Sequence, residues 1–245
     1  MKTIENKSFE LIVILGATAT GKTKLAVNLS NHLNGEIISA DSRQIYKGLD
    51  IGTGKDYEEY YINNKKIPYH LIDIIDLYDN YSVHQFQMDF KKAYDKITNK
   101  NRIPILCGGT GLYIESILLD YSFMQSPPNK ILRKKLNDKD INELINMVNK
   151  NIITKLNHSE LNNKRRIIRL IEKEANTRIE KSQPILIQNP IIIGINYNRE
   201  TIRNKITTRL KYRIDNGLIE EVQNLINNGI SHDRLLYYGL EYKYL

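Results

Sequence analysis

The chain has 245 residues, 41% hydrophobic and 26% charged, which is enough to bury a core and is ordinary for a globular protein. It contains no apolar run long enough to span a membrane and no signal-peptide stretch near Met1, so we expect no membrane association. A single cysteine, Cys107, excludes an internal disulfide framework and leads us to expect a cytoplasmic protein. The net charge of +8 suits a polyanionic partner such as RNA. AT-rich codons for Lys, Asn, Ile and Tyr explain the charge equally well.

A phosphate-binding loop is predicted at residues 16–23, which read GATATGKT. The apolar run 11–15 precedes it and a helix-like run follows, which is the strand–turn–helix context of a P-loop. The loop amides and the helix N-terminus would direct partial positive charge at an anion. Lys22 would reach the terminal phosphates, and the Thr23 hydroxyl would hold Mg²⁺. The predicted phosphate-binding residues are Gly16, Ala17, Thr18, Ala19, Thr20, Gly21, Lys22 and Thr23.

Asp41 follows a second short strand, expected over residues 36–40. Ligands of open α/β sheets bind at the carboxyl ends of the strands, so Asp41 and the P-loop should face one crevice. A carboxylate beside phosphates repels them unless it binds a metal or accepts a proton from a second substrate. A turn or capping aspartate is the alternative. Asp73 and Asp76, in the strand-like run 68–76, are either metal-assisting acids or surface residues.

A third buried strand is expected over residues 103–107, closed by the glycine turn 108–111 and followed by a helix over 113–119. The turn offers amides and the Thr110 hydroxyl to the same crevice. Cys107 has no basic partner nearby in the sequence, so we expect a small core residue rather than a nucleophile. Ser82 is expected to cap the helix before this strand.

A helical insertion is predicted over residues 126–188, between a P-loop core over 1–125 and a return to the core over 189–245. The insertion is polar and lacks strand signals. Its run 164–169 places arginines three or four residues apart on one helix face, which could meet a phosphate backbone or simply be solvated.

The return to the core begins with a strand over 190–195, followed by a long helix that breaks at Asn216-Gly217. An apolar stripe repeats every four residues and is expected to face a core. Its members are Ile202, Ile206, Leu210, Ile214, Leu218 and Val222. Cations run beside the stripe at the same spacing, and one of them is expected to lean over the P-loop. These cations are Lys205, Arg209 and Arg213. The fold class is therefore α/β: a P-loop NTPase-like parallel sheet flanked by helices, with an all-helical insertion.

The motifs, taken in order, resemble the tRNA dimethylallyltransferase (tRNA isopentenyltransferase) family over nearly the whole chain. The combination of P-loop, D-S-R-Q and G-G-T-G-x-Y is specific, although no single motif is. The segments that carry the resemblance are 16–23, 40–55, 68–74, 104–118, 165–169, 209–222 and 237–242. The resemblance stops at residue 245, whereas family members continue into a further helical segment, so the sequence is either a fragment or a shortened protein.

The resemblance implies transfer of a dimethylallyl group from dimethylallyl diphosphate to N6 of the adenosine beside the anticodon of tRNA. The P-loop becomes the donor site, with Mg²⁺ on Thr23, and Asp41, Thr110 and Arg209 become the catalytic residues. The implied tRNA-binding residues are Asp41, Ser42, Arg43, Gln44, Thr110, Arg133, Arg165, Arg166, Ile167, Ile168 and Arg169. Tyr46, Tyr113 or a neighbouring tyrosine is a candidate stacking surface for the adenine, and we expect a monomer. The alternatives are a prenyltransferase for free adenine nucleotides, a small-molecule P-loop kinase and an inactive tRNA-binding remnant.

Overall fold

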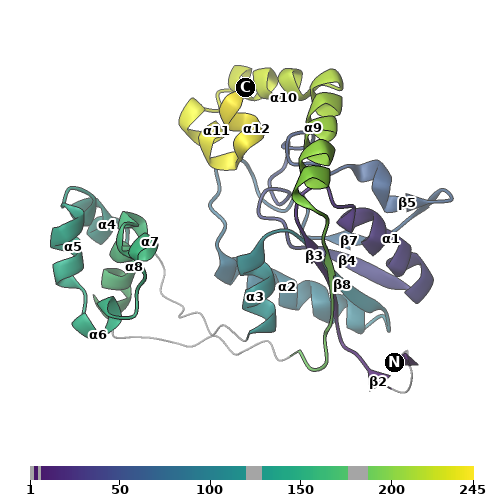
Figure 1. The fold of residues 1–245 in the computed structure, drawn as a ribbon, viewed down its shortest axis with the longest axis horizontal. Helices are drawn as coiled ribbons and strands as arrows, with labels where there is room; N and C mark the ends of the chain where they lie inside the picture. The colour runs from purple at the N-terminus through teal and green to yellow at the C-terminus, as the bar shows by residue number, and fades with distance from the viewer. Residues whose placement is uncertain (1–2, 5–6, 120–128, 176–186) are drawn as a thin grey trace. The chain divides into compact units, whose positions relative to one another are not determined.

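The computed structural model describes residues 3–4, 7–119, 129–175 and 187–245 (Figure 1). The chain divides into two compact units, which we call the core unit (residues 1–121 and 185–245) and the helical unit (residues 122–184). The insertion expected over 126–188 overlaps the helical unit. The expected start at 126 lies outside the described residues, and the expected end at 188 lies four residues beyond the end of the helical unit at 184.

A five-stranded parallel sheet forms the centre of the core unit, in the order β7-β4-β8-β3-β9. The predicted parallel α/β fold is therefore confirmed. The expected strands at 36–40, 103–107 and 190–195 are also present, with ends shifted by about one residue. The strands are β3 (Ile12–Gly16), β4 (Gly35–Ser39), β7 (Tyr69–His70), β8 (Ile103–Gly108) and β9 (Ile191–Ile195).

Helices cover both faces of this sheet because alternate residues of each buried strand point to opposite sides. On one face Ile12, Ile14 and their neighbours pack with helix α1 (Lys22–Leu33). On the other face Val13 packs with helices α2 (Val83–Thr98) and α3 (Gly111–Leu118). The result is a three-layer α/β/α arrangement.

Ser82 caps helix α2, as the sequence predicts. Its hydroxyl accepts a hydrogen bond from the Gln85 backbone N–H at 3.2 Å, and the Gln85 side chain accepts one from the Ser82 backbone N–H at 2.8 Å. This reciprocal capping box satisfies two otherwise unpaired donors at the start of the helix. The short elements of the core unit are β1 (Thr3–Ile4), β2 (Lys7–Ser8), η1 (Tyr57–Tyr60), β5 (Tyr61–Ile62) and β6 (Lys65–Lys66).

The helical unit has a hydrophobic core of its own. Leu136, Leu144, Val148 and Ile171 are buried there together with Ile167 and Ile168. Its helices are α4 (Lys130–Asn137), α5 (Ile141–Met147), α6 (Lys150–Ile153), α7 (His158–Leu161) and α8 (Lys164–Ala175).

Four helices end the chain, and α10–α12 gather beside one end of α9 (Figure 1). The expected break is present, because α9 is capped at Asn216 and α10 at Gly217, whose φ of +103° favours glycine. The helices are α9 (Arg199–Asp215), α10 (Leu218–Asn227), α11 (His232–Tyr238) and α12 (Leu240–Tyr244). No helix among the described residues is long and apolar enough to cross a membrane.

The apolar stripe behaves differently in α9 and in α10. Leu218 and Val222 of α10 are buried, as predicted, but Ile206 and Leu210 of α9 are 36% and 41% exposed. The prediction of a core-facing stripe is therefore wrong for α9, where Arg213 is the buried residue. The reason is that the buried end of α9 contacts a polar loop rather than an apolar sheet face.

Candidate active site

The P-loop connects β3 to α1 and closes tightly on itself. Gly16 has a φ of +157°, and a Cβ atom there would lie 2.5 Å from the Ile195 carbonyl oxygen of the neighbouring strand. The Thr20 hydroxyl and the Lys22 ammonium both donate to the Ala17 carbonyl, at 2.8 and 2.6 Å. These contacts hold the lysine against the loop. The strand–turn–helix context of the motif is confirmed.

A cavity of about 620 Å³ lies against this loop within the core unit. It brings together five parts of the chain: the P-loop, the turn that begins at Asp41, the loop 53–60, the end of β8 and helix α9. Its lining residues are Thr18, Ala19, Thr20, Gly21, Lys22, Thr23, Asp41, Gln44, Thr53, Gly54, Asp56, Glu59, Tyr60, Cys107, Gly108, Asn204, Lys205, Thr208, Arg209 and Tyr212. The expectation that Asp41 and the P-loop face one crevice is confirmed.

The turn after β4 is tied to the end of β8. Asp41 Oδ1 accepts a hydrogen bond from the Arg43 N–H at 2.8 Å. The Thr110 hydroxyl accepts one from the Ser42 N–H at 3.0 Å, and the Thr110 N–H donates to the Ala40 carbonyl at 3.1 Å. Thr110 thus fixes the turn that presents Asp41, whereas the Thr110 side chain is not among those that line the cavity.

Gln44 reaches the cavity with its side-chain amide in a fixed orientation. Its Nε2 donates to the Gly54 carbonyl at 2.9 Å, and its Oε1 accepts from the Ser39 hydroxyl at 3.1 Å. A carbonyl oxygen can only accept, so the amide nitrogen must face Gly54. The loop that carries Gly54 therefore determines how Gln44 is presented to a bound molecule.

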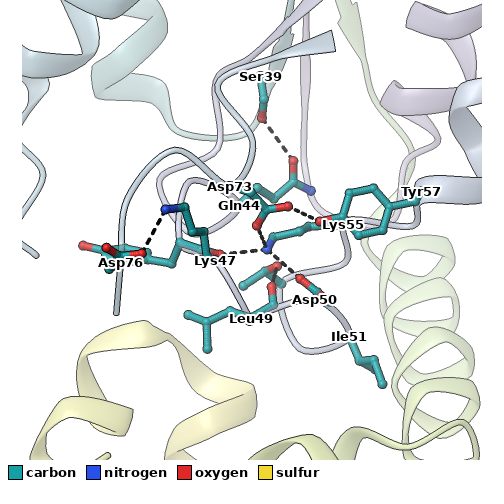
Figure 2. Close-up of polar contacts among 12 residues, drawn as sticks. Ser39, Gln44, Lys47, Leu49, Asp50, Ile51, Lys55, Tyr57, Asp73 and Asp76 are labelled. Carbon is teal, nitrogen blue, oxygen red and sulfur yellow. Dashed lines mark hydrogen bonds and ion pairs between the residues drawn. The ribbon is translucent and has the colours of Figure 1, made fainter. Parts of the chain in front are cut away.

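A buried ammonium holds this loop in place, as Figure 2 shows. The Lys55 side chain has no exposed surface and donates to Asp50 and to the Tyr46 carbonyl, both at 2.7 Å, and to Asp73. The Tyr57 hydroxyl donates to the other oxygen of Asp73. Sequence reasoning missed this role of Lys55, because a lysine after a glycine turn carries no signal of burial.

The alternative acids have partners elsewhere. Asp73 pairs with Lys55, and Asp76 pairs with Lys47 at 3.0 Å (Figure 2). Neither residue lines the cavity, so the suggestion that one of them assists a bound metal is not supported by their positions.

Arg209 is the cation that leans over the P-loop. Its guanidinium donates to the Thr18 hydroxyl, and Lys205 also lines the cavity. Burial lowers the pKa of Lys22, and the Asp41 and Cys107 side chains partly offset this effect. Burial and the nearby Arg213 likewise lower the pKa of Arg209. Two partly desolvated cations at one end of the cavity provide a site for an anion, because poorly hydrated cations attract anions strongly.

Asp56 and Glu59 also line the cavity, and sequence reasoning missed both. They lie at the cap and within η1, in a polar stretch without a recognisable pattern. Burial raises the pKa of Glu59, and Asp56 raises it further. No group of three His, Cys, Asp or Glu side chains suited to hold a metal occurs in the part of the chain that the structure describes.

Three aromatic or thiol side chains near the site are buried. Tyr46 and Tyr113 are 1% and 5% exposed, and Tyr113 stacks on Phe86, so the prediction that either offers a stacking surface to an adenine is wrong. Cys107 is also buried, which raises the pKa of its thiol to about 12, and it packs in the core as predicted.

The predicted tRNA-binding arginines of the helical unit are partly engaged in ion pairs. Both Arg133 and Arg169 contact Glu172, which is buried, with N–O distances from 2.7 to 3.0 Å. Arg166 pairs with Glu160 at 2.6 Å. Arg165 on α8 is exposed.

Ile167 and Ile168 belong to the core of the helical unit, where their exposed fractions are 0% and 4%. Their side chains therefore pack inward, and the basic run of α8 would meet a polyanion through its charged side chains rather than through these isoleucines. Contact between any of these residues and tRNA stays a prediction.

The fold and the cavity define a P-loop α/β protein in which Lys22, Arg209 and Asp41 line one cavity. The chain belongs to the IPP transferase family, whose model matches residues 44–245. It is 49% identical over 245 residues to tRNA dimethylallyltransferase 1 of Azobacteroides pseudotrichonymphae, covering 99% of this chain and 80% of that protein. It is 51% identical over 241 residues to tRNA dimethylallyltransferase 2 of Bacteroides fragilis, covering 97% and 78%.

Solved structures resemble the chain as well. A full-length tRNA isopentenylpyrophosphate transferase from Bacillus halodurans is 33% identical, with a TM-score of 0.62 over 91% of this chain and 72% of that one. A eukaryotic dimethylallyltransferase acting on tRNA shares the fold at 23% identity, with a TM-score of 0.73 over 93% and 59% of the two chains.

Proposed function

We propose that this protein transfers a dimethylallyl group from dimethylallyl diphosphate to N6 of the adenosine beside the anticodon of tRNA. The observation that carries the proposal is the shared cavity, which has the P-loop and Arg209 at one end and Asp41 among its walls. The curated relatives named above are tRNA dimethylallyltransferases, which supports the same reaction.

The donor diphosphate is assigned to the P-loop. In the reaction the bond between C1 of the dimethylallyl group and the diphosphate oxygen breaks, the bond between C1 and adenine N6 forms, and diphosphate leaves. Negative charge builds up on the leaving group, and the loop amides, Lys22 and Arg209 stabilise it. Because these donors are held by Ala17 and Thr18 in the protein itself, little reorganisation is needed.

Asp41 is assigned as the base. The N6 lone pair of adenine is delocalised into the ring, so attack on C1 benefits from removal of the N6 proton as the bond forms. The Arg43 N–H holds Oδ1 of Asp41, which leaves Oδ2 to accept this proton. Thr110 contributes by holding the turn through Ser42.

Mg²⁺ fits the residues at the P-loop. The Thr23 hydroxyl and the carboxylates of the cavity are hard oxygen donors, and Mg²⁺ usually binds one or two such groups together with phosphates and water. Bound there, the ion would neutralise charge on the diphosphate. Thr23 is the residue proposed to hold it.

The proposed acceptor is an unstacked adenine in single-stranded RNA, which reaches such a cavity at modest energetic cost. Arg43 and the basic face of α8, including Arg165, are the proposed contacts with the phosphate backbone. The basic side chains of the helical unit, such as the exposed Arg165, support an RNA acceptor over a free nucleotide.

The test is to supply the protein with dimethylallyl diphosphate and compare an anticodon stem-loop RNA with AMP. The proposal predicts prenylated adenosine in the RNA and far less product from AMP. Preference for AMP would favour the free-nucleotide prenyltransferase. Phosphate transfer from ATP to a small acceptor would favour the kinase, and RNA binding without product would favour the inactive remnant.

A further inference from the structure

Helix α9 is held to the rest of the core unit in an unusual way. Of its seventeen residues, Arg213 is the one with a buried side chain, only 4% exposed. The apolar positions Ile206 and Leu210 stay 36% and 41% exposed. The fully buried contact of α9 is therefore a polar anchor, Arg213.

The loop under α9 is shaped to receive that anchor. Arg213 Nη1 donates to the Gly52 carbonyl at 3.3 Å, and the guanidinium lies 3.7 Å from Asp56 and 3.9 Å from Glu241. A Cβ atom at Gly54 would lie 1.7 Å from Arg213 Nη2, and Gly54 has a φ of +66°. A side chain at this position would displace the guanidinium, and the positive φ favours glycine.

The same loop is fixed from two other sides. Lys55 holds it from the core, as described above, and Glu221 of α10 accepts from the backbone N–H groups of Asp50, Ile51 and Gly52 at 2.9, 2.7 and 3.1 Å. A buried arginine that grips this loop is therefore attached to a rigid support.

Arg209 lies one helical turn before Arg213, so the two side chains share a face of α9. Arg209 contacts Thr18 of the P-loop while Arg213 contacts the loop around Gly54. Two guanidinium groups this close repel each other, and separate anchors are needed to hold both. Loss of the Arg213 anchor would leave α9 without its one buried side chain and would loosen the placement of Arg209.

We propose that Arg213 is a positioning residue: by fixing α9 on the loop around Gly54, it places Arg209 over the P-loop for binding of a diphosphate. This inference rests on the proposed role of Arg209 at the donor site. Arg213 itself does not line the cavity, so it acts through Arg209 and not by touching the anion.

The test is the binding of inorganic pyrophosphate, measured by calorimetry, which does not require prenyl transfer. We expect Arg213→Met to weaken binding about tenfold, because a displaced Arg209 loses charge-assisted hydrogen bonds to the anion. The matched control is Lys211→Met, which removes one charge from an exposed position on the same helix and should change binding less than twofold. Arg213→Lys keeps the charge but has one donor group, so we expect a loss of several-fold.

A double-mutant cycle shows whether Arg213 acts through Arg209. In an Arg209→Met background, Arg213→Met should weaken pyrophosphate binding less than twofold. Additive losses of pyrophosphate affinity would overturn the proposal, because Arg213 would then act independently of Arg209. Equal losses in Arg213→Met and Lys211→Met would also overturn it, because they would indicate a general charge effect. If Arg213→Met fails to fold by circular dichroism, Arg213→Lys decides, and unchanged binding there overturns the proposal. A wild-type protein that shows this pattern but transfers no prenyl group would contradict the proposed function alone.

Discussion

Replacing Lys55 with Met tests the buried ion-pair cluster of Figure 2. The substitution keeps a flexible chain of similar length in a side-chain site that has no exposed surface. It removes the ammonium that joins Asp50, Asp73 and the Tyr46 carbonyl. The loop that presents Gly54 to Gln44 loses its support from the core.

The expected loss follows from how each partner is buried. Removing one member of a fully buried ion pair costs about 3–5 kcal/mol, because an unpaired charge stays in the interior. Here the side chains of Asp50 and Asp73 are 49% and 34% exposed, so water can solvate them once the lysine is gone. We therefore expect Lys55→Met to lower the free energy of unfolding by about 2–3 kcal/mol, most of it from the Tyr46 carbonyl, which loses its buried donor.

Urea unfolding followed by circular dichroism measures this loss. With a denaturant slope of about 2–3 kcal/mol/M, the midpoint should fall by about 1 M. The control is Lys47→Met, which breaks the exposed Lys47–Asp76 pair and should change the free energy of unfolding by less than about 0.5 kcal/mol. Equal effects of the two substitutions would refute the reasoning, because burial would then not determine the outcome.

Further predictions concern the site and two other buried acids. Asp41→Asn should lower turnover by at least about 100-fold and change pyrophosphate binding by no more than about twofold. Lys22→Met should lower turnover and also weaken pyrophosphate binding. Steady-state kinetics measures the turnover, and calorimetry measures the binding. Burial alone would raise the pKa of Glu36. Hydrogen bonds to its carboxylate, of which the one from His70 has the largest effect, outweigh burial and hold this pKa below its ordinary value of 4.5. Its stabilising contribution is therefore present above pH 4.5 and lost as the pH falls through the folded-state pKa, so urea unfolding of Glu36→Gln should depend less on pH in that range. Glu172→Gln should destabilise the helical unit, because it weakens the buried acceptor of two arginines, and limited proteolysis should cut the helical unit faster than in the wild type.

The sheet and the P-loop could be predicted because local pattern and tertiary role agree there. The runs 12–16 and 103–108 are apolar and end in glycine, and the run 35–39 is centred on Ile37 and Ile38. Short apolar runs followed by polar turns are typical of buried parallel strands. Parallel strands end at one edge of a sheet, so the position of Asp41 opposite the loop followed from its place in the sequence.

Helix α9 could not be predicted in the same way. Its apolar residues repeat every four positions, and so do the cations Lys205, Arg209 and Arg213 beside them. Periodicity alone therefore does not say which of the two helix faces is buried. The answer depends on Gly52, Gly54 and Asp56, which lie about 160 residues earlier in the chain. Asp56 and Glu59 could not be predicted either, because they reach the cavity through a loop whose sequence has no regular pattern.

The most direct test of the central claim is mass analysis of adenosine in an anticodon stem-loop RNA after incubation with the protein and dimethylallyl diphosphate. We expect a dimethylallyl group on N6 with the wild-type protein and its near-complete loss with Asp41→Asn. Equal product from the two proteins would contradict the assignment of Asp41 as the base, and unmodified RNA from a wild-type protein that binds both substrates would contradict the proposed reaction itself.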